Sequence, residues 1–171
     1  MNTTINKYAV LSSELKDSDE FEFDEELKSI REKGDVEMIP ALVEFIEDET
    51  IDTHRRHKIA ELLGDITTPS AREILIEAVN KLRGKPALAM VISSLWQSRL
   101  DFSQWLDIFV EIMFEEELYT AIEAVTLIEN SLEKLDENQK TDLRNSIRDR
   151  IILCEDETRK FLILDMLNNL I

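Results

Sequence analysis

The chain has 171 residues, of which 37 are acidic and 20 are basic, so its formal net charge is −17. Because 43% of the residues are hydrophobic, the chain can form a core of its own, which excludes a disordered acidic tail. The acid excess disfavours nonspecific binding of nucleic acid, which needs many Lys and Arg side chains at the phosphates. A single cysteine excludes an internal disulfide bond, and three glycines and three prolines provide few of the turns of an all-β protein.

The charge is distributed unevenly along the chain. Residues 1–53 hold 16 acids and 5 bases, residues 54–100 hold 4 acids and 8 bases, and residues 101–171 hold 17 acids and 7 bases. We interpret the basic middle as charge balance inside one folded unit, with ligand binding as the alternative, because net charge governs solubility and association rather than fold.

Apolar residues recur at helical spacing from residue 24 onward, and short polar segments predict the connections between helices. Thr68 is expected to cap one helix with Pro69 in its first turn, and Gly84 to lie near the end of that helix. In chain order, the predicted core faces are Ile39, Leu42, Val43, Phe45 and Ile46; Ile59, Leu62, Leu63 and Ile66; Ile74, Leu75, Ala78, Val79 and Leu82; Leu88, Val91, Ile92, Leu95 and Trp96; Phe102, Trp105, Leu106, Phe109, Val110 and Met113; Ile122, Val125, Ile128 and Leu132; Leu143, Ile147, Ile151 and Cys154; and Phe161, Leu164, Leu167 and Ile171.

These faces form four consecutive helix pairs that recur along the chain. Leu42, Ile74 and Trp105 occupy matching positions in the first helices, at offsets of 32 and 31 residues. A period of about 30–35 residues built from helix pairs is typical of an α-solenoid, in which each unit buries its face against its neighbours. The sequence therefore predicts an all-α fold, an α-solenoid (α-α superhelix) of about four antiparallel helix pairs with an N-terminal cap.

The residues from Gly34 to Val79 resemble HEAT repeats, in particular the short bacterial HEAT-like kind. The resemblance is carried by Ile39-Pro40-Ala41-Leu42, by Asp52 three residues before Arg55, and by Leu62-Leu63-Gly64-Asp65-Ile66. Asp156-Glu157-Thr158-Arg159 repeats the Asp-x-x-Arg motif near the C-terminus. In such repeats the Asp caps the second helix and the Arg commonly pairs with acids of the neighbouring unit, so the resemblance implies a structural role for both.

Residues 1–23 differ from the rest of the chain, because acidic and aromatic residues alternate at their end. We expect an acidic N-terminal arm or a partly ordered cap over residues 1–23, with Phe21 and Phe23 packing on the first repeat. Residues 24–171 are then expected to form a single HEAT-like repeat domain.

No residue pattern predicts a cofactor, a metal site or a catalytic centre. His54, His57 and Glu61 could supply zinc ligands, but a third histidine is absent and the cations Arg55, Arg56 and Lys58 adjoin them. The chain has no P-loop, nucleophile elbow or dinucleotide-binding glycine motif. Cys154 is predicted to be a small core residue rather than a nucleophile.

Aromatic residues cluster between positions 96 and 119, and the helix around Trp105 is apolar on more than one side. We interpret this helix as buried in the middle of the solenoid. The alternative is that Trp96 or Trp105 faces a groove and anchors a partner.

The second helix of each pair lines the concave side of HEAT-like solenoids, so the resemblance suggests a binding surface there. The polar residues expected on this surface are His57, Glu61, Asp65, Ser94, Gln97, Glu123 and Asn130. Every surface helix also has a polar face, and this remains the competing interpretation.

The sequence thus predicts a non-catalytic protein-protein interaction module of HEAT-like type. A sharper hypothesis makes it an acidic inhibitor or immunity-type protein that binds a basic partner, since opposite charge speeds such encounters. The alternative is a HEAT-like enzyme, similar to bilin lyases or to DNA glycosylases. Nucleic-acid partners are disfavoured, no membrane-spanning segment is expected, and a cytoplasmic location is the default expectation.

Overall fold

The computed structural model describes residues 3–169, and it describes side chains from Val10 to Asn168. Over the described residues the chain forms α-helices and short 3-10 helices joined by loops, and no β-strand. The predicted all-α class is therefore confirmed.

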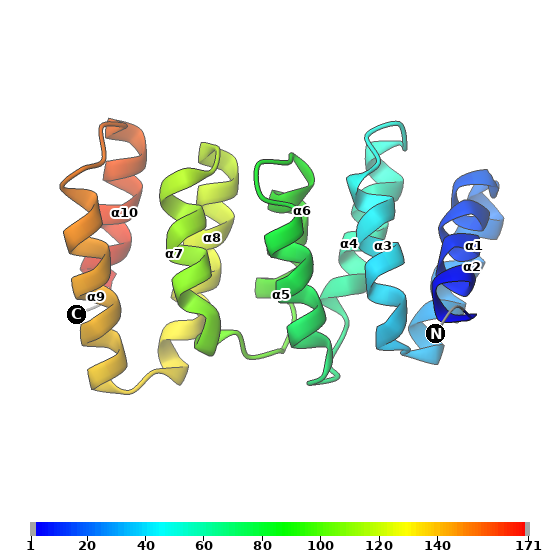
Figure 1. Cartoon of the computed structure of the whole chain (residues 1–171), viewed down its shortest axis with the longest axis horizontal. Coiled ribbons are helices and arrows are strands. Elements are labelled where there is room, and N and C mark those ends of the chain that lie inside the picture. Colours follow the sequence, from blue (N-terminus) through cyan, green and yellow to red (C-terminus); the bar gives the residue numbers. More distant parts are fainter. Residues whose placement is uncertain (1–2, 170–171) are drawn as a thin grey trace. The chain divides into compact units, whose positions relative to one another are not determined.

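The chain divides into two compact units, residues 1–100 and residues 101–171. This division differs from the expected one, because position 23/24 lies inside a helix and the expected domain of residues 24–171 is divided after Leu100. In each unit the helices pack on neighbours in sequence and also on the next helix but one (Figure 1). The first unit contains α1 (Thr3–Asp17), α2 (Glu20–Lys33), α3 (Ile39–Glu47), α4 (Thr53–Gly64), α5 (Ala71–Lys81) and α6 (Ala87–Gln97), with the 3-10 helix η1 (Val36–Met38) before α3. The second unit contains α7 (Leu106–Glu115), α8 (Leu118–Ser131), α9 (Glu137–Ile151) and α10 (Glu157–Asn169), with η2 (Ser103–Trp105) before α7 and η3 (Leu132–Lys134) after α8.

Local sequence explains where several helices begin and end. Asp19 caps α2 by accepting a hydrogen bond from the Glu22 amide at 2.9 Å, and the Glu22 carboxylate accepts from the Asp19 amide at 3.2 Å. This capping box satisfies two amides that the first helical turn leaves without partners. Gly34 ends the same helix with φ of 59°, a left-handed conformation that glycine adopts without a steric penalty.

The predicted start of α5 is wrong in detail. The helix begins at Ala71, after Ser70. Thr68 contributes its backbone carbonyl, which accepts a hydrogen bond from the Ala71 amide at 3.0 Å. Gly84 lies just beyond the end of α5 with φ of 73°, as the sequence indicated.

The N-terminal helices are part of the core of the first unit. Phe23 on α2 is fully buried, and its ring stacks on that of Phe45 on α3 with 5.8 Å between centroids. Leu15 on α1 is buried as well, whereas Phe21 is exposed. Of the two phenylalanines expected to pack on the first repeat, only Phe23 does so.

Arg55 joins α4 to the C-terminal end of α1. Asp52 caps α4 by accepting from the His54 amide at 2.9 Å, which fixes the backbone from which the Arg55 side chain extends. One guanidinium nitrogen of Arg55 then donates to the carbonyl of Leu15 at 2.7 Å and to the hydroxyl of Ser18 at 2.8 Å. The guanidinium carbon also stands 4.1 Å from the centre of the Phe23 ring. Arg55 thus supplies donors to carbonyls that the last turn of α1 leaves without helical partners.

The second unit repeats this arrangement at Asp156 and Arg159. Asp156 accepts hydrogen bonds from the backbone at the start of α10, including the Arg159 amide at 3.1 Å. The Arg159 guanidinium donates to the carbonyls of Met113 at 2.7 Å and Glu116 at 2.6 Å, at the C-terminal end of α7. The capping role that the resemblance implied for the Asp residues is confirmed. The expected pairing of Arg with neighbouring acids is not what Arg55 and Arg159 do, because their principal partners are backbone carbonyls.

Other cations of the basic middle segment also bind within the first unit. The Arg56 side chain is buried and donates to the Ile46 carbonyl at 2.6 Å. Lys58 lies between Asp24 at 2.8 Å and Glu20 at 2.7 Å, and these carboxylates, Asp24 foremost, raise the pKa of Lys58 above its usual range. These contacts agree with the interpretation that the basic segment balances charge inside one folded unit.

Arg55→Ala removes the side chain that holds the end of α1 on α4. Because hydrogen bonds to charged groups contribute about 1.5–3 kcal/mol and cation–π contacts about 0.5–2 kcal/mol, we expect the free energy of unfolding to fall by about 2–4 kcal/mol. Urea denaturation followed by circular dichroism measures the change. Arg99→Ala is the matched control, because Arg99 is exposed, and its loss should cost less than about 0.5 kcal/mol. Equal losses in the two variants would contradict the structural role of Arg55.

Candidate binding surface

The predicted polar surface is exposed in the first unit except at one residue. His57, Glu61 and Asp65 on or after α4 and Gln97 on α6 are exposed. Ser94 is buried, with 2% exposure, and its hydroxyl donates to the Val91 carbonyl at 2.6 Å. The prediction for Ser94 is therefore wrong.

The close packing of α4 on α6 explains the burial of Ser94. Gly64, at the end of α4, faces the Ser94 carbonyl, which lies 3.4 Å from where a Cβ on Gly64 would stand. Because Gly64 has no side chain, the backbones of α4 and α6 approach closely there, and the side of α6 that carries Ser94 packs against α4. Spacing along α6 alone does not contain this information.

The remaining predicted residues, Glu123 and Asn130, lie on α8 in the second unit. Glu123 is half-buried and Asn130 is exposed. The predicted surface is thus divided between two units, with His57, Glu61, Asp65 and Gln97 in one and Glu123 and Asn130 in the other.

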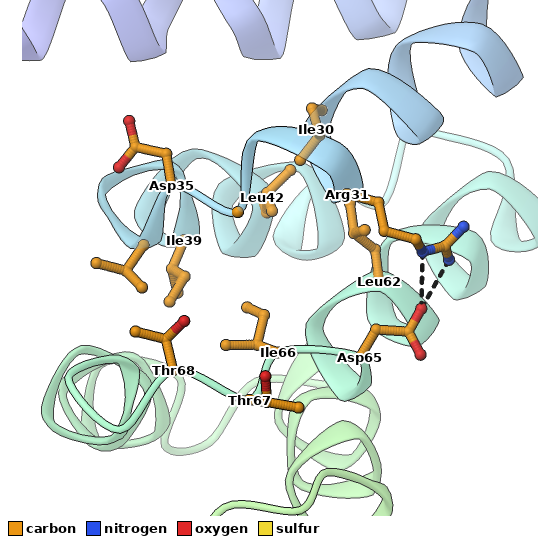
Figure 2. A pocket seen from close by; sticks show the side chains of 12 residues that line it. Ile30, Arg31, Asp35, Ile39, Leu42, Leu62, Asp65, Ile66, Thr67 and Thr68 are labelled. Carbon is orange, nitrogen blue, oxygen red and sulfur yellow. Dashed lines mark hydrogen bonds and ion pairs between the residues drawn. The ribbon is translucent and has the colours of Figure 1, made fainter.

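A small cavity of about 140 Å³ lies in the first unit between the end of α2, η1 with the start of α3, and the loop after α4 (Figure 2). Its walls include the apolar side chains of Ile30, Ile39, Leu42, Leu62 and Ile66. At one side the Arg31 guanidinium reaches the Asp65 carboxylate, with nitrogen–oxygen distances of 2.9 and 2.8 Å. About half of the Arg31 and Asp65 side-chain surface is exposed, so water weakens the ion pair. The lining contains no cysteine, serine or histidine, and we assign no chemistry to the cavity.

No three His, Cys, Asp or Glu side chains among the described residues gather as a metal site would require. His57 places Nδ1 2.8 Å from the Thr53 carbonyl of its own helix, and His54 and Glu61 are exposed. His54, His57 and Glu61 therefore do not form an acid–base pair held in a fixed geometry.

Cys154 is not the core residue that the sequence predicted. Helix α9 ends at Ile151, so Cys154 lies in the connection to α10 rather than on a helix face. Its side chain is half-buried, and its Sγ lies 3.6 Å from the Asp156 carbonyl, a weak hydrogen bond.

Two of the six aromatic residues between positions 96 and 119 are buried in the core, three are half-buried, among them Phe114, and Tyr119 is exposed. Phe102 and Phe109 are buried, whereas Trp96 and Trp105 are half-buried. The ring centroids of Phe102 and Trp105 stand 6.2 Å apart. Neither tryptophan is fully exposed as an anchor or fully enclosed as a core residue.

Several apolar side chains of the second unit are exposed, which helical spacing did not predict. Ile122, Phe161 and Leu164 were predicted to face the core, yet their side chains are 40%, 74% and 45% exposed. Tyr119, one turn before Ile122 on α8, is 66% exposed. The side of α10 that faces the core carries Ile163, Met166 and Leu167 instead. Because α10 is apolar on two sides, periodicity identifies a helix but not which side is buried.

Acidic side chains form a second exposed feature at the turn between α1 and α2. Glu14, Asp17, Glu22 and Glu26 line an open hollow of about 440 Å³ together with Ser13, Leu15 and Ser18. Glu22 is engaged in the capping box of α2. The lining residues of this hollow include no Lys or Arg.

Comparison of the chain with protein-family models, with curated proteins and with solved structures returns no match. The resemblance to HEAT repeats accordingly stays a prediction from the sequence. Among the described residues, no helix has both the length and the apolar content needed to cross a membrane.

The position of Cys154 predicts its reactivity. Because the thiol is half-buried in a connection, a thiol reagent such as Ellman's reagent should label one cysteine per folded chain without denaturant. Absorbance of the released thiolate measures the rate, and urea-unfolded protein provides the reference. Labelling that occurs only after unfolding would contradict this placement and would indicate that Cys154 lies in the core.

Proposed function

We propose that the protein is a non-catalytic protein-binding module of HEAT-like α-solenoid type that binds a basic partner, as an acidic inhibitor or immunity-type protein does. The proposal is carried by the placement of the charged side chains of the first unit. Arg55, Arg56 and Lys58 are engaged inside the first unit, while acids such as Glu14, Asp17 and Glu26 remain at the surface. A surface of this kind attracts and orients a basic protein.

The alternative enzymatic functions have less support. A DNA glycosylase-like protein needs cations on the surface that faces the phosphates, whereas three bases of the basic segment bind carbonyls or carboxylates. A bilin lyase-like activity has no residue pattern in this chain to carry it. The half-buried Cys154 lines a separate open hollow in the second unit, and the other lining residues, Phe114, Arg150, Leu153, Glu155, Asp156 and Arg159, include no histidine.

A pull-down with the immobilised chain at several salt concentrations tests the proposed function. We expect the captured proteins to be basic, and their capture to fall steeply as ionic strength rises, since salt screens exposed charges. Neutralising three acids of the hollow (Glu14→Gln, Asp17→Asn, Glu26→Gln) should weaken capture about tenfold or more.

A matched variant controls for the loss of net charge. Glu133, Asp142 and Asp149 are exposed acids of the second unit, and their neutralisation removes the same charge elsewhere. It should change capture less than about threefold. Capture of neutral or acidic proteins, insensitivity to salt, or a mobility shift of duplex DNA at low salt would contradict the proposed function.

A further inference from the structure

The second unit presents four exposed apolar side chains on two neighbouring helices, and we name them the α8–α10 patch. They are Tyr119 and Ile122 on α8, and Phe161 and Leu164 on α10. Helices α8 and α10 contact each other, and Figure 1 shows them on the same side of the unit, behind α7 and α9. An apolar group of this kind on adjacent elements is typical of an interaction site rather than of scattered surface residues.

The two helices place their exposed apolar residues at similar heights in the unit. The loops that lead into α8 and α10 lie at the same end of the unit (Figure 1), and Ile122 and Phe161 are each the fifth residue of their helix. They therefore stand at about the same level of the unit. Tyr119 precedes Ile122 by three residues and Leu164 follows Phe161 by three, spacings that place each pair on one helix face.

Charged groups around the patch are predominantly acidic. Glu157 and Asp165 flank Phe161 at four residues on either side of it along α10, and Glu123 follows Ile122 on α8. The cation on this part of α10 is Lys160, which pairs with Glu157 at 3.8 Å. Arg159 points inward to the end of α7, and only 11% of its side chain is exposed. The patch thus has an apolar centre and an acidic rim.

We propose that the α8–α10 patch docks an amphipathic, basic α-helix of a partner protein. Apolar residues on one stripe of such a helix cover the four side chains, and Lys or Arg residues beside the stripe meet the exposed Glu157 and Asp165. This inference rests on the proposed function in one respect, the basic character of the partner.

A second copy of the chain fits the patch less well. Two patches face to face would bring the same acidic rim residues against each other, and like charges at an interface oppose association. Charge therefore favours a basic segment over self-association.

A labelled peptide of Leu and Lys, with Leu at helical spacing on one face, provides the probe, and fluorescence anisotropy measures its dissociation constant. Ile122→Ser with Phe161→Ser should raise the dissociation constant at least tenfold. Phe21→Ser with Val10→Ser is the matched control, because Phe21 and Val10 are 76% and 50% exposed in the first unit. That control should change the constant less than twofold, and thermal unfolding midpoints verify that both variants remain folded.

The outcomes separate the patch from the proposed function. If the Leu/Lys peptide binds in a salt-dependent way but equally to both double variants, the patch is overturned and the acidic binder stands. A scrambled Leu/Lys peptide that binds as tightly as the amphipathic one also overturns the patch. If a Leu/Glu peptide binds as well as the Leu/Lys peptide, or if neither binds, the patch is overturned as well. Sedimentation that shows a dimer dissociated by Ile122→Ser with Phe161→Ser assigns the patch to self-association instead.

Discussion

In each unit of this protein, one arginine near the start of a helix donates hydrogen bonds to carbonyls at the C-terminal end of a helix that comes earlier in the chain. These hydrogen bonds organise the unit. Arg55 reaches the end of α1, and Arg159 reaches the end of α7. In both cases an aspartate three residues earlier caps the helix and fixes where the arginine starts. A guanidinium is suited to this role because it carries several donors in a fixed plane and stays charged. Helix ends that would otherwise lose their hydrogen bonds in a packed interior are satisfied in this way.

The same interaction shapes the surface. The charge of Lys58 is balanced by the acids that it pairs with, and Arg55 and Arg159 direct their guanidinium groups to helix ends inside a unit rather than to the solvent. Some acids also have partners inside a unit, and Asp48 is an example. Its carboxylate accepts a hydrogen bond from the Thr50 hydroxyl and pairs with the Lys16 ammonium, and these contacts, Thr50 foremost, hold the pKa of the carboxyl well below the usual range. Many other acids remain at the surface, and this unbalanced charge supports a basic partner protein as the proposed ligand.

Much of the fold could be predicted from the sequence, and less of the site. Helix positions from α3 onward followed from apolar spacing, whereas α1 and α2 did not. The capping by Asp52 and Asp156 was implied by the resemblance to HEAT repeats. The partners of Arg55 and Arg159 were not predictable, because a carbonyl at a helix end leaves no mark in the side-chain sequence. Ser94 was misplaced since close packing at Gly64 is a property of two helices together. Phe161 was misplaced because its helix is apolar on two sides.

Hydrogen exchange measured by mass spectrometry on Arg159→Met tests most directly whether the arginine–carbonyl contact organises a unit. The account predicts faster exchange at the C-terminal turn of α7 and at the start of α10, with the first unit unchanged. Arg148→Met is the control, because Arg148 is an exposed cation of α9, and its exchange should match that of the unaltered protein. Exchange in Arg159→Met that is indistinguishable from that of Arg148→Met would contradict the account.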